Sequence, residues 1–257
     1  REGAAVVVAD LDVAGGQEVV AAITAAGGRA QFMRANVADP ADVAALVASW
    51  QPDAVSTVGD NNYPDGTAAT IDNDIGRHYH DFIYPYKGSH GAGATSNRFF
   101  PTLGNHDWHT TSGTPPLPAP YLDYFTLPGN ERYYDVVVGP VHVFAVDSDP
   151  HEPDGIESTS VQADWLRAGL GGSTAPWRLV FMHHPPYSSS STHGSTPELQ
   201  WPYAAWGANA VLAGHDHAYE RIQRDGIFYF VNGMGGAALY PFGVPVDGSQ
   251  VRYNADY

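Results

Sequence analysis

Four clusters of Asp, Asn and His side chains each follow an apolar stretch of this 257-residue chain. In order, the clusters read GDNNY at 59–63, GNHD at 104–107, HHPPY at 183–187 and GHDHAYER at 214–221. The sequence contains no cysteine, so every candidate ligand is an oxygen or an imidazole donor. Such donors suit divalent or trivalent ions such as zinc, manganese or iron. The four clusters therefore predict a metal site.

Each cluster, taken alone, has a simpler explanation. Asp60 could close a strand as an Asx-type turn, and Gly104-Asn105-His106 could be an ordinary turn. Alternate residues of an extended segment point to opposite sides. His215 and His217 could therefore reach two different metals, or one of them could be structural. Four such clusters in this order, each at the end of a predicted strand, favour one shared site.

The strands that must position these residues are short apolar runs. Residues 54–58, which end at Gly59, have the pattern of a buried parallel strand. Similar runs precede the other clusters, at 99–103, 178–182 and 210–213, and a further run lies at 227–231. Ligands of open α/β sheets bind just outside the carboxyl ends of the strands. We therefore expect the clusters to lie together at such an edge.

The first fifty residues alternate between strand and helix patterns. Strand-like runs at 4–9 and 29–35 alternate with helical patterns at 15–26 and 39–50. Asp39 followed by Pro40 is typical of a helix start. Together with residues 54–59, this order predicts a parallel sheet with helical crossovers. We expect an α/β fold with an N-terminal Rossmann-like βαβα extension.

The composition limits the possible partners. The formal charge is 12 − 28 = −16, which excludes binding of nucleic acid through a basic face. No apolar run is long enough to span a bilayer, so we expect no membrane partner. The absence of cysteine excludes disulfides and a cysteine nucleophile, and it decides no compartment.

The motifs GDNNY, GNHD, FMHHPPY and GHDHAYER together resemble those of the calcineurin-like metallophosphoesterases, specifically of the purple acid phosphatase branch. The resemblance covers about Val43 to Tyr257, and the branch rests on Tyr63 and on the residues AYER. It implies a sandwich of two mixed sheets flanked by helices. It also implies hydrolysis of small phosphomonoesters at a centre of two metal ions, in a secreted or periplasmic protein.

By the same resemblance, six residues would bind the metals: Asp60, Tyr63, Asn105, His183, His215 and His217. Asp60 would bridge the two ions. Tyr63 and His217 would serve the first ion, where a tyrosinate suits ferric iron. Asn105, His183 and His215 would bind the second ion, which would be zinc, manganese or iron. Two such ions lower the pKa of a bound water and hold the phosphoryl oxygens during the displacement.

Two further histidines would face the substrate. His106 would contact the phosphate as an acid or a stabiliser of charge. His193, in the loop after Tyr187, loosely matches a substrate-contacting histidine. His184 stands where the family uses no ligand, so we interpret it as a residue that packs behind the ligands.

Residues Arg1–Ala48 resemble an internal piece of a short-chain dehydrogenase/reductase, in the stretches REGAAVVVADLDVAGG and AAGGRAQFMRANVADPADVAALVA. In that family an acid at the position of Asp10 would receive the adenosine ribose of NAD. The glycine-rich turn that should precede this strand is absent, and no Tyr-x-x-x-Lys pair follows. We therefore disfavour an NAD-binding oxidoreductase. We expect a Rossmann-like segment at 1–48, foreign to the rest, and a metallophosphoesterase domain at 49–257 that lacks closing strands.

The phosphoesterase family places one more aspartate, in an Asp-x-Gly motif, at the end of its first strand. This chain has no such motif in the equivalent place. Asn36 stands nearest by topology, and Asp39 is the alternative, although Asp39 also starts a predicted helix. We therefore expect weak occupancy of the first metal site and low activity. A non-catalytic protein that binds metal or phosphate at the second site alone is the alternative function.

If Asn36 occupies the place of the missing aspartate, Asn36→Asp should strengthen metal binding and raise turnover. The reason is that a ferric ion depends on anionic oxygen donors. Titration of metal into both proteins, followed by rate measurements, tests this prediction. Equal affinity and equal rate would leave Asp39, or no residue, in that role.

Overall fold

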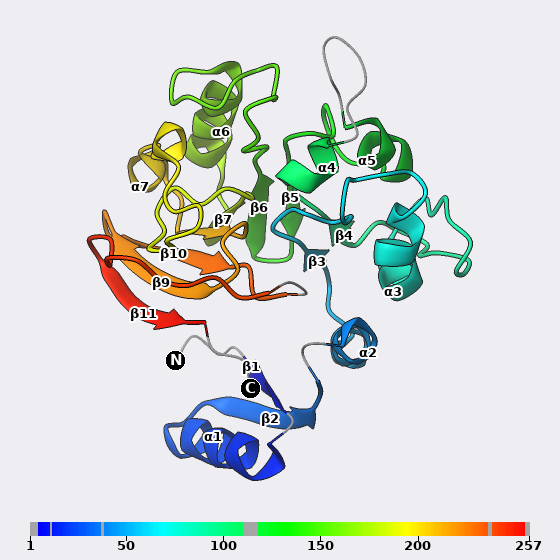
Figure 1. Ribbon diagram of the computed structural model, residues 1–257, viewed down its shortest axis with the longest axis vertical. Helices are drawn as coiled ribbons and strands as arrows, with labels where there is room; N and C mark the ends of the chain where they lie inside the picture. The colour runs from blue at the N-terminus through cyan, green and yellow to red at the C-terminus, as the bar shows by residue number, and fades with distance from the viewer. Residues whose placement is uncertain (1–4, 11, 37–38, 110–117, 236–237, 255–257) are drawn as a thin grey trace. The chain divides into compact units, whose positions relative to one another are not determined.

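The computed structural model describes residues 5–10, 12–36, 39–109, 118–235 and 238–254. The chain divides into two compact units, Arg1–Pro52 and Asp53–Tyr257 (Figure 1). Within the described ranges, no helix combines the length and the apolar character that a membrane span requires.

The N-terminal unit contains two strands and two helices. Strands β1 (Ala5–Asp10) and β2 (Arg29–Arg34) pair in parallel, and helix α1 (Val13–Ala25) connects them. A Cβ atom at Gly16 of α1 would lie 2.2 Å from the Phe32 ring, so this glycine permits close packing of α1 on β2. Helix α2 (Pro40–Trp50) starts where the sequence predicts, with the Asp39 carboxylate accepting from the Ala41 N–H. A Rossmann-like extension of a larger sheet stays a prediction.

The larger unit contains the remaining elements. One turn of π-helix is labelled η1, and the 3-10 turns are labelled η2 and η3. In chain order these elements are β3 (Val55–Ser56), η1 (Asp72–Gly76), α3 (Arg77–Tyr79), η2 (His80–Phe82), β4 (Phe99–Phe100), α4 (Asn105–Trp108), α5 (Ala119–Tyr124), β5 (Tyr134–Val138), β6 (Val141–Ala145), α6 (Val161–Gly172), β7 (Trp177–Phe181), η3 (Pro197–Leu199), α7 (Tyr203–Trp206), β8 (Ala210–Ala213), β9 (Tyr219–Arg224), β10 (Ile227–Asn232) and β11 (Ser249–Tyr253).

A seven-stranded mixed sheet forms the centre of the larger unit, in the order β11–β9–β10–β8–β7–β6–β5. Strands β6, β7, β8 and β10 run parallel, whereas β5, β9 and β11 are antiparallel to their neighbours. The carboxyl ends of β6, β7 and β8 therefore lie side by side at one edge (Figure 1). The expected α/β fold with a large mixed sheet is confirmed.

Helices α6 and α7 cover this sheet with apolar side chains. The residues at the centre of this contact are at most 2 % exposed: Phe144, Leu166, Leu170, Val180, Tyr203 and Val211. The core thus joins the strands whose carboxyl ends carry the predicted site.

The other sheet of the larger unit is much shorter than a sandwich requires. Strands β3 and β4 pair in parallel over two residues, Val55 opposite Phe99 and Ser56 opposite Phe100. After these two pairs the backbone pairing stops, and the Thr57 carbonyl accepts a hydrogen bond from the Thr102 hydroxyl at 3.1 Å. Among the described residues, the larger unit thus has one large mixed sheet and one short parallel sheet, and a sandwich of two mixed sheets stays a prediction.

Asp72 ties the π-helical turn η1 to its surroundings. Its Oδ1 accepts from the hydroxyls of Tyr86 at 2.5 Å and Tyr124 at 2.7 Å, and its Oδ2 accepts from the Ser89 N–H at 2.9 Å. Burial alone would raise the pKa of Asp72, but these hydrogen bonds lower it to about 2. The same turn holds the loop after β3, since the Asp74 carboxylate accepts from the Tyr63 N–H at 3.1 Å.

Asp72→Asn should destabilise the protein at pH 7 by about 1–3 kcal/mol, because the variant loses acceptors for charge-assisted hydrogen bonds. The folded-state pKa lies below the unfolded value of 3.8. The contribution of the carboxylate is therefore complete above about pH 5 and is lost as the pH falls toward 2. Urea unfolding of both proteins between pH 7 and pH 3 measures this difference.

The matched control is Asp81→Asn, whose side chain is 80 % exposed. This variant should change the free energy of unfolding by less than about 0.5 kcal/mol. A deficit of Asp72→Asn that stayed constant down to pH 3 would contradict a role for the charged form.

Candidate metal centre

Strand ends bring the predicted residues together. Asp60 follows β3, Asn105 begins α4 after β4, His183 follows β7 and His215 follows β8. Backbone hydrogen bonds continue the pairing of β7 with β8 as far as the histidines, since the Gly214 N–H donates to the His183 carbonyl at 3.0 Å. The carboxyl ends of neighbouring parallel strands thus place both histidines at one point.

Three ligand atoms surround the Nε2 atom of His183. Asn105 Oδ1 lies at 2.9 Å, His215 Nδ1 at 3.1 Å and Asp60 Oδ2 at 3.3 Å. The Nδ1 atom of His183 lies 2.8 Å from the Val58 carbonyl oxygen and must donate to it. In a neutral imidazole, Nε2 then carries a lone pair. Asn105 Oδ1 and Asp60 Oδ2 also direct lone pairs at this point, as does His215 Nδ1 when that ring carries its hydrogen on Nε2, and a cation would satisfy all four atoms.

The pKa values of these side chains reflect this repulsion. Burial would lower the pKa of His183, but the hydrogen bond and the charge of Asp60 raise it. Burial would raise the pKa of Asp60, but His183 and the His106 N–H lower it. Burial and the charge on His183 lower the pKa of His215 to about 2. The side chains alone thus favour the protonated form of His183, at the point where a metal ion would supply more charge.

The donor set fits a divalent metal ion. It combines two oxygen donors, Asp60 and Asn105, with two imidazoles, His183 and His215. Two donors that are each about 2.0–2.2 Å from one ion stand about 3 Å apart. The separations of 2.9–3.3 Å around His183 Nε2 match this spacing.

Tyr63 and His106 contact the other side of Asp60. The Tyr63 hydroxyl donates to Asp60 Oδ2 at 2.9 Å, and the His106 N–H donates to Asp60 Oδ1 at 3.0 Å. The two rings lie 4.4 Å apart, and the Nδ1 atom of His106 hydrogen-bonds the Pro64 carbonyl. Burial and the charge of Asp60 raise the pKa of Tyr63, so the phenol keeps its proton until a cation displaces it.

His217 and His193 both contact Tyr240. The Nδ1 atom of His217 donates to the Ala238 carbonyl at 2.9 Å, and its ring stacks on Tyr240 at 4.1 Å. The His193 ring lies 4.1 Å from that of His215 and 5.4 Å from that of Tyr240. Sequence reasoning missed Tyr240, because no motif marks it and only the fold brings it back to these histidines.

Two buried carboxylates hold the loop that carries His193. Asp216 accepts from the Ser188 hydroxyl at 2.6 Å and from the Gly194 N–H at 3.2 Å. Glu220 accepts from the Ser189 N–H at 2.7 Å. Both carboxylates belong to the GHDHAYER motif, so this motif positions the loop as well as offering its own histidines.

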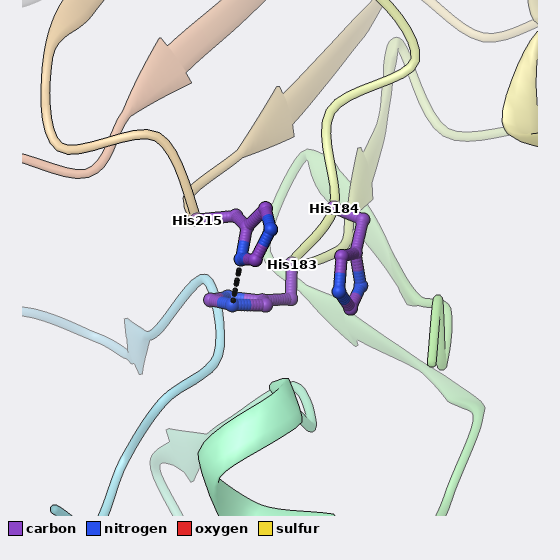
Figure 2. Close-up of side chains that lie close together, drawn as sticks. All are labelled: His183, His184 and His215. Atoms are coloured by element: carbon purple, nitrogen blue, oxygen red, sulfur yellow. Dashed lines mark hydrogen bonds between the residues drawn. The ribbon is translucent and has the colours of Figure 1, made fainter. Parts of the chain in front are cut away.

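His184 lies next to two of the predicted ligands, His183 and His215, and its role there stays a prediction. Among the described residues, ring nitrogens of His183, His184 and His215 lie within 4.8 Å of one another, and Figure 2 shows the three rings converging from the segments after β7 and β8. The ring of His184 lies 4.3 Å from that of His215. Burial and the charge on His183 lower the pKa of His184 to about 3.

Asn36 and Asp39 belong to the N-terminal unit. The Asn36 N–H donates to Asp42 Oδ2 at 2.9 Å, and Asp39 caps helix α2. A metal-binding role for either residue stays a prediction.

Close approach of the loops depends on glycines and on one buried acid. A Cβ atom at Gly104 would lie 2.2 Å from the backbone nitrogen of Asp60, and one at Gly59 would lie 2.5 Å from the His183 ring. Asp107 joins the same loops, since it accepts from the Gly104 N–H at 2.9 Å and from the Asn61 side chain at 3.0 Å. Burial, opposed by these hydrogen bonds, raises the pKa of Asp107 to about 7.

Comparison with known proteins relates this geometry to a family. The family model described as calcineurin-like phosphoesterase matches residues 8–219. Tartrate-resistant acid phosphatase type 5 of Oryctolagus cuniculus is 29 % identical over 118 residues, which cover 44 % of this chain and 33 % of that protein. Purple acid phosphatase 22 of Arabidopsis thaliana is 28 % identical over 199 residues, which cover 65 % of this chain and 44 % of that protein. The matches thus span less than half the length of these curated relatives.

A solved structure supports the fold. The structure named "GAP50 the anchor in the inner membrane complex of Plasmodium" superposes with a TM-score of 0.53 at 14 % identity. The match covers 85 % of this chain and 73 % of that one. At this identity the likeness concerns the fold alone.

Gly104→Ala should destabilise the protein by about 1–3 kcal/mol and weaken metal binding, because the new methyl group would push the Asp60 backbone away from His183. Gly171→Ala is the matched control, since a Cβ at that position meets nothing within 4 Å. Denaturant unfolding and metal titration of both variants measure the effects. Normal metal affinity in Gly104→Ala would show that the spacing of the β3 and β4 loops is unimportant for the site.

Proposed function

The chain belongs to the calcineurin-like phosphoesterase family, and from this premise we propose that it is a metal-dependent phosphatase that hydrolyses small phosphomonoesters. The acid phosphatases among its relatives support this substrate class. The family implies divalent metal ions, and we propose two of them, iron with zinc, manganese or iron.

One observation carries the proposal. The lone pairs of Asp60, Asn105 and His215 converge on His183 Nε2 within 2.9–3.3 Å. Because Nδ1 of His183 faces a carbonyl oxygen, the ring presents Nε2 as a ligand. Hydrogen bonding from the ring's other nitrogen to a carbonyl is the usual orientation of a metal-binding histidine.

Each predicted site residue has a proposed role. Bound metal ions lower the pKa of a water ligand and neutralise phosphoryl oxygens. Asp60, whose Oδ2 atom contacts both Tyr63 and His183, would hold both ions and reduce their mutual repulsion. Tyr63 and His217 would complete the first position, and the Asn105, His183 and His215 side chains the second.

His106 and His193 would face the substrate. The Nδ1–H group of His106 donates to the Pro64 carbonyl. Its Nε2 atom would therefore give a proton or a hydrogen bond to the departing oxygen only from the doubly protonated imidazolium ring. His193 lies against His215 at 4.1 Å, beside the second position, where it would contact a phosphoryl oxygen.

Asp60→Asn should lose at least one of the two metal ions and nearly all turnover, a fall of about 10³-fold or more, because both ions share this carboxylate. Metal analysis of the purified protein and the rate of p-nitrophenyl phosphate hydrolysis are the measurements. Removal of metal by a chelator should abolish wild-type turnover, and addition of iron with zinc or manganese should restore it.

Asp164→Asn is the control, because this side chain is 60 % exposed and pairs only with Arg167 in the described contacts. It should keep normal metal content and rate. Wild-type metal content and rate in Asp60→Asn would refute the proposed centre. Wild-type protein that binds one metal without turnover would instead support the non-catalytic binder.

A further inference from the structure

His184 lies at the proposed metal centre without a role in it. Its ring lies 4.3 Å from that of His215 and 5.0 Å from that of His183 (Figure 2). As the third member of the histidine cluster, His184 could serve the site in two ways. It could be a further metal ligand through a lone pair, or it could donate a hydrogen bond through an N–H group. The two roles require different tautomers.

Ser148, which follows β6, decides the tautomer. Its Oγ accepts two backbone hydrogen bonds, from the main-chain N–H of His184 at 2.8 Å and from the main-chain N–H of His183 at 3.2 Å. A hydroxyl oxygen has two lone pairs and one hydrogen. Both lone pairs are therefore used, and the hydroxyl hydrogen points to the remaining neighbour, His184 Nδ1, at 3.0 Å. Nδ1 of His184 must accept this hydrogen bond.

The consequence is that His184 carries its own hydrogen on Nε2. An imidazole whose Nδ1 is an acceptor has Nε2–H in its neutral form. His183 and His217 are the opposite case, because their Nδ1 atoms face the carbonyl oxygens of Val58 and Ala238 and leave Nε2 with a lone pair. The structure thus distinguishes ligand histidines from a donor histidine. No hydrogen-bond partner of His184 Nε2 is found in the described part of the chain.

We propose that the Nε2–H group of His184 donates a hydrogen bond to a phosphoryl oxygen of the substrate, and that Ser148 is the positioning residue that keeps it in this tautomer. The inference rests on the proposed phosphatase function. A phosphomonoester dianion bound at the second metal position would have His193 and His184 next to it, since both rings contact His215. A neutral N–H donor to a charged oxygen gives a strong hydrogen bond without adding a positive charge beside the metals.

Kinetics with a conservative variant tests the role. His184→Ala should weaken inhibition by inorganic phosphate by about 10- to 100-fold, the range for a hydrogen bond to a charged group, and should lower kcat/KM by a similar factor. His184→Gln, whose amide can donate from nearly the same place as Nε2, should recover most of both losses. Metal content should stay at the wild-type value in both variants. His90→Ala, an exposed histidine in the 83–98 loop, is the control and should leave all three quantities unchanged.

Tautomers can be read independently of turnover. Long-range ¹H–¹⁵N spectra of protein stripped of metal should show His184 protonated at Nε2 alone and His217 protonated at Nδ1, with His184→Gln giving the assignment. A His184 ring protonated at Nδ1 would overturn the inference.

Other outcomes separate the two proposals. Loss of one metal ion in His184→Ala would make His184 a ligand and overturn the donor role. If the wild-type protein is active and phosphate inhibits His184→Ala as strongly as it inhibits the wild type, this inference is wrong and the phosphatase function stands. Wild-type protein that neither binds metal nor hydrolyses phosphomonoesters would refute the proposed function, and the inference with it.

Discussion

The site depends on one electrostatic conflict. Asp60, Asn105 and His215 direct lone pairs at the Nε2 atom of His183, which the Val58 carbonyl leaves with a lone pair of its own. Folding brings these atoms within 3.3 Å of His183 although they repel one another. The raised pKa of His183 and the lowered pKa of Asp60 are the response of the side chains themselves. A cation of higher charge satisfies all four atoms better than one proton does.

The scaffold can impose this conflict because its loops approach closely. Three of the four motifs have a glycine directly before the ligand, and the structure gives these glycines a common reason. A Cβ at Gly59 would meet the His183 ring, one at Gly104 the Asp60 backbone, and one at Gly214 the Val58 carbonyl oxygen at 2.8 Å. Only Gly59 of the three also needs a positive φ, at 88°. At these three positions glycine is needed mainly because another loop lies too close for a Cβ atom, and only at Gly59 also because of the backbone conformation.

The positions of the predicted ligands at strand ends could be read from sequence, because apolar runs that stop at Gly-Asp, Gly-Asn or Gly-His are local patterns. The pairing of Ser148 with His184, and of Tyr240 with His217, could not, since each joins segments that only the sheet order brings together. The short length of the β3–β4 ladder could not be read from the apolar runs either, because a side-chain hydrogen bond from the Thr102 hydroxyl to the Thr57 carbonyl follows the last paired residues. The resemblance assigns His184 no ligand role, and its tautomer depends on Ser148, thirty-six positions earlier, which no local pattern reveals.

Charge explains why the bound ions and the N–H donors must act together. The chain has a formal charge of −16, which repels a phosphomonoester dianion. Among the described contacts of the site residues, none involves Lys or Arg, so no permanent cationic side chain is aimed at the substrate there. In the proposed phosphatase, attraction for the phosphate would come from the metal ions, and orientation from a neutral donor such as the Nε2–H group of His184. Burial and the charge on His183 lower the pKa values of His184 and His215, which fits this proposal, because a protonated ring would repel the proposed metal ions.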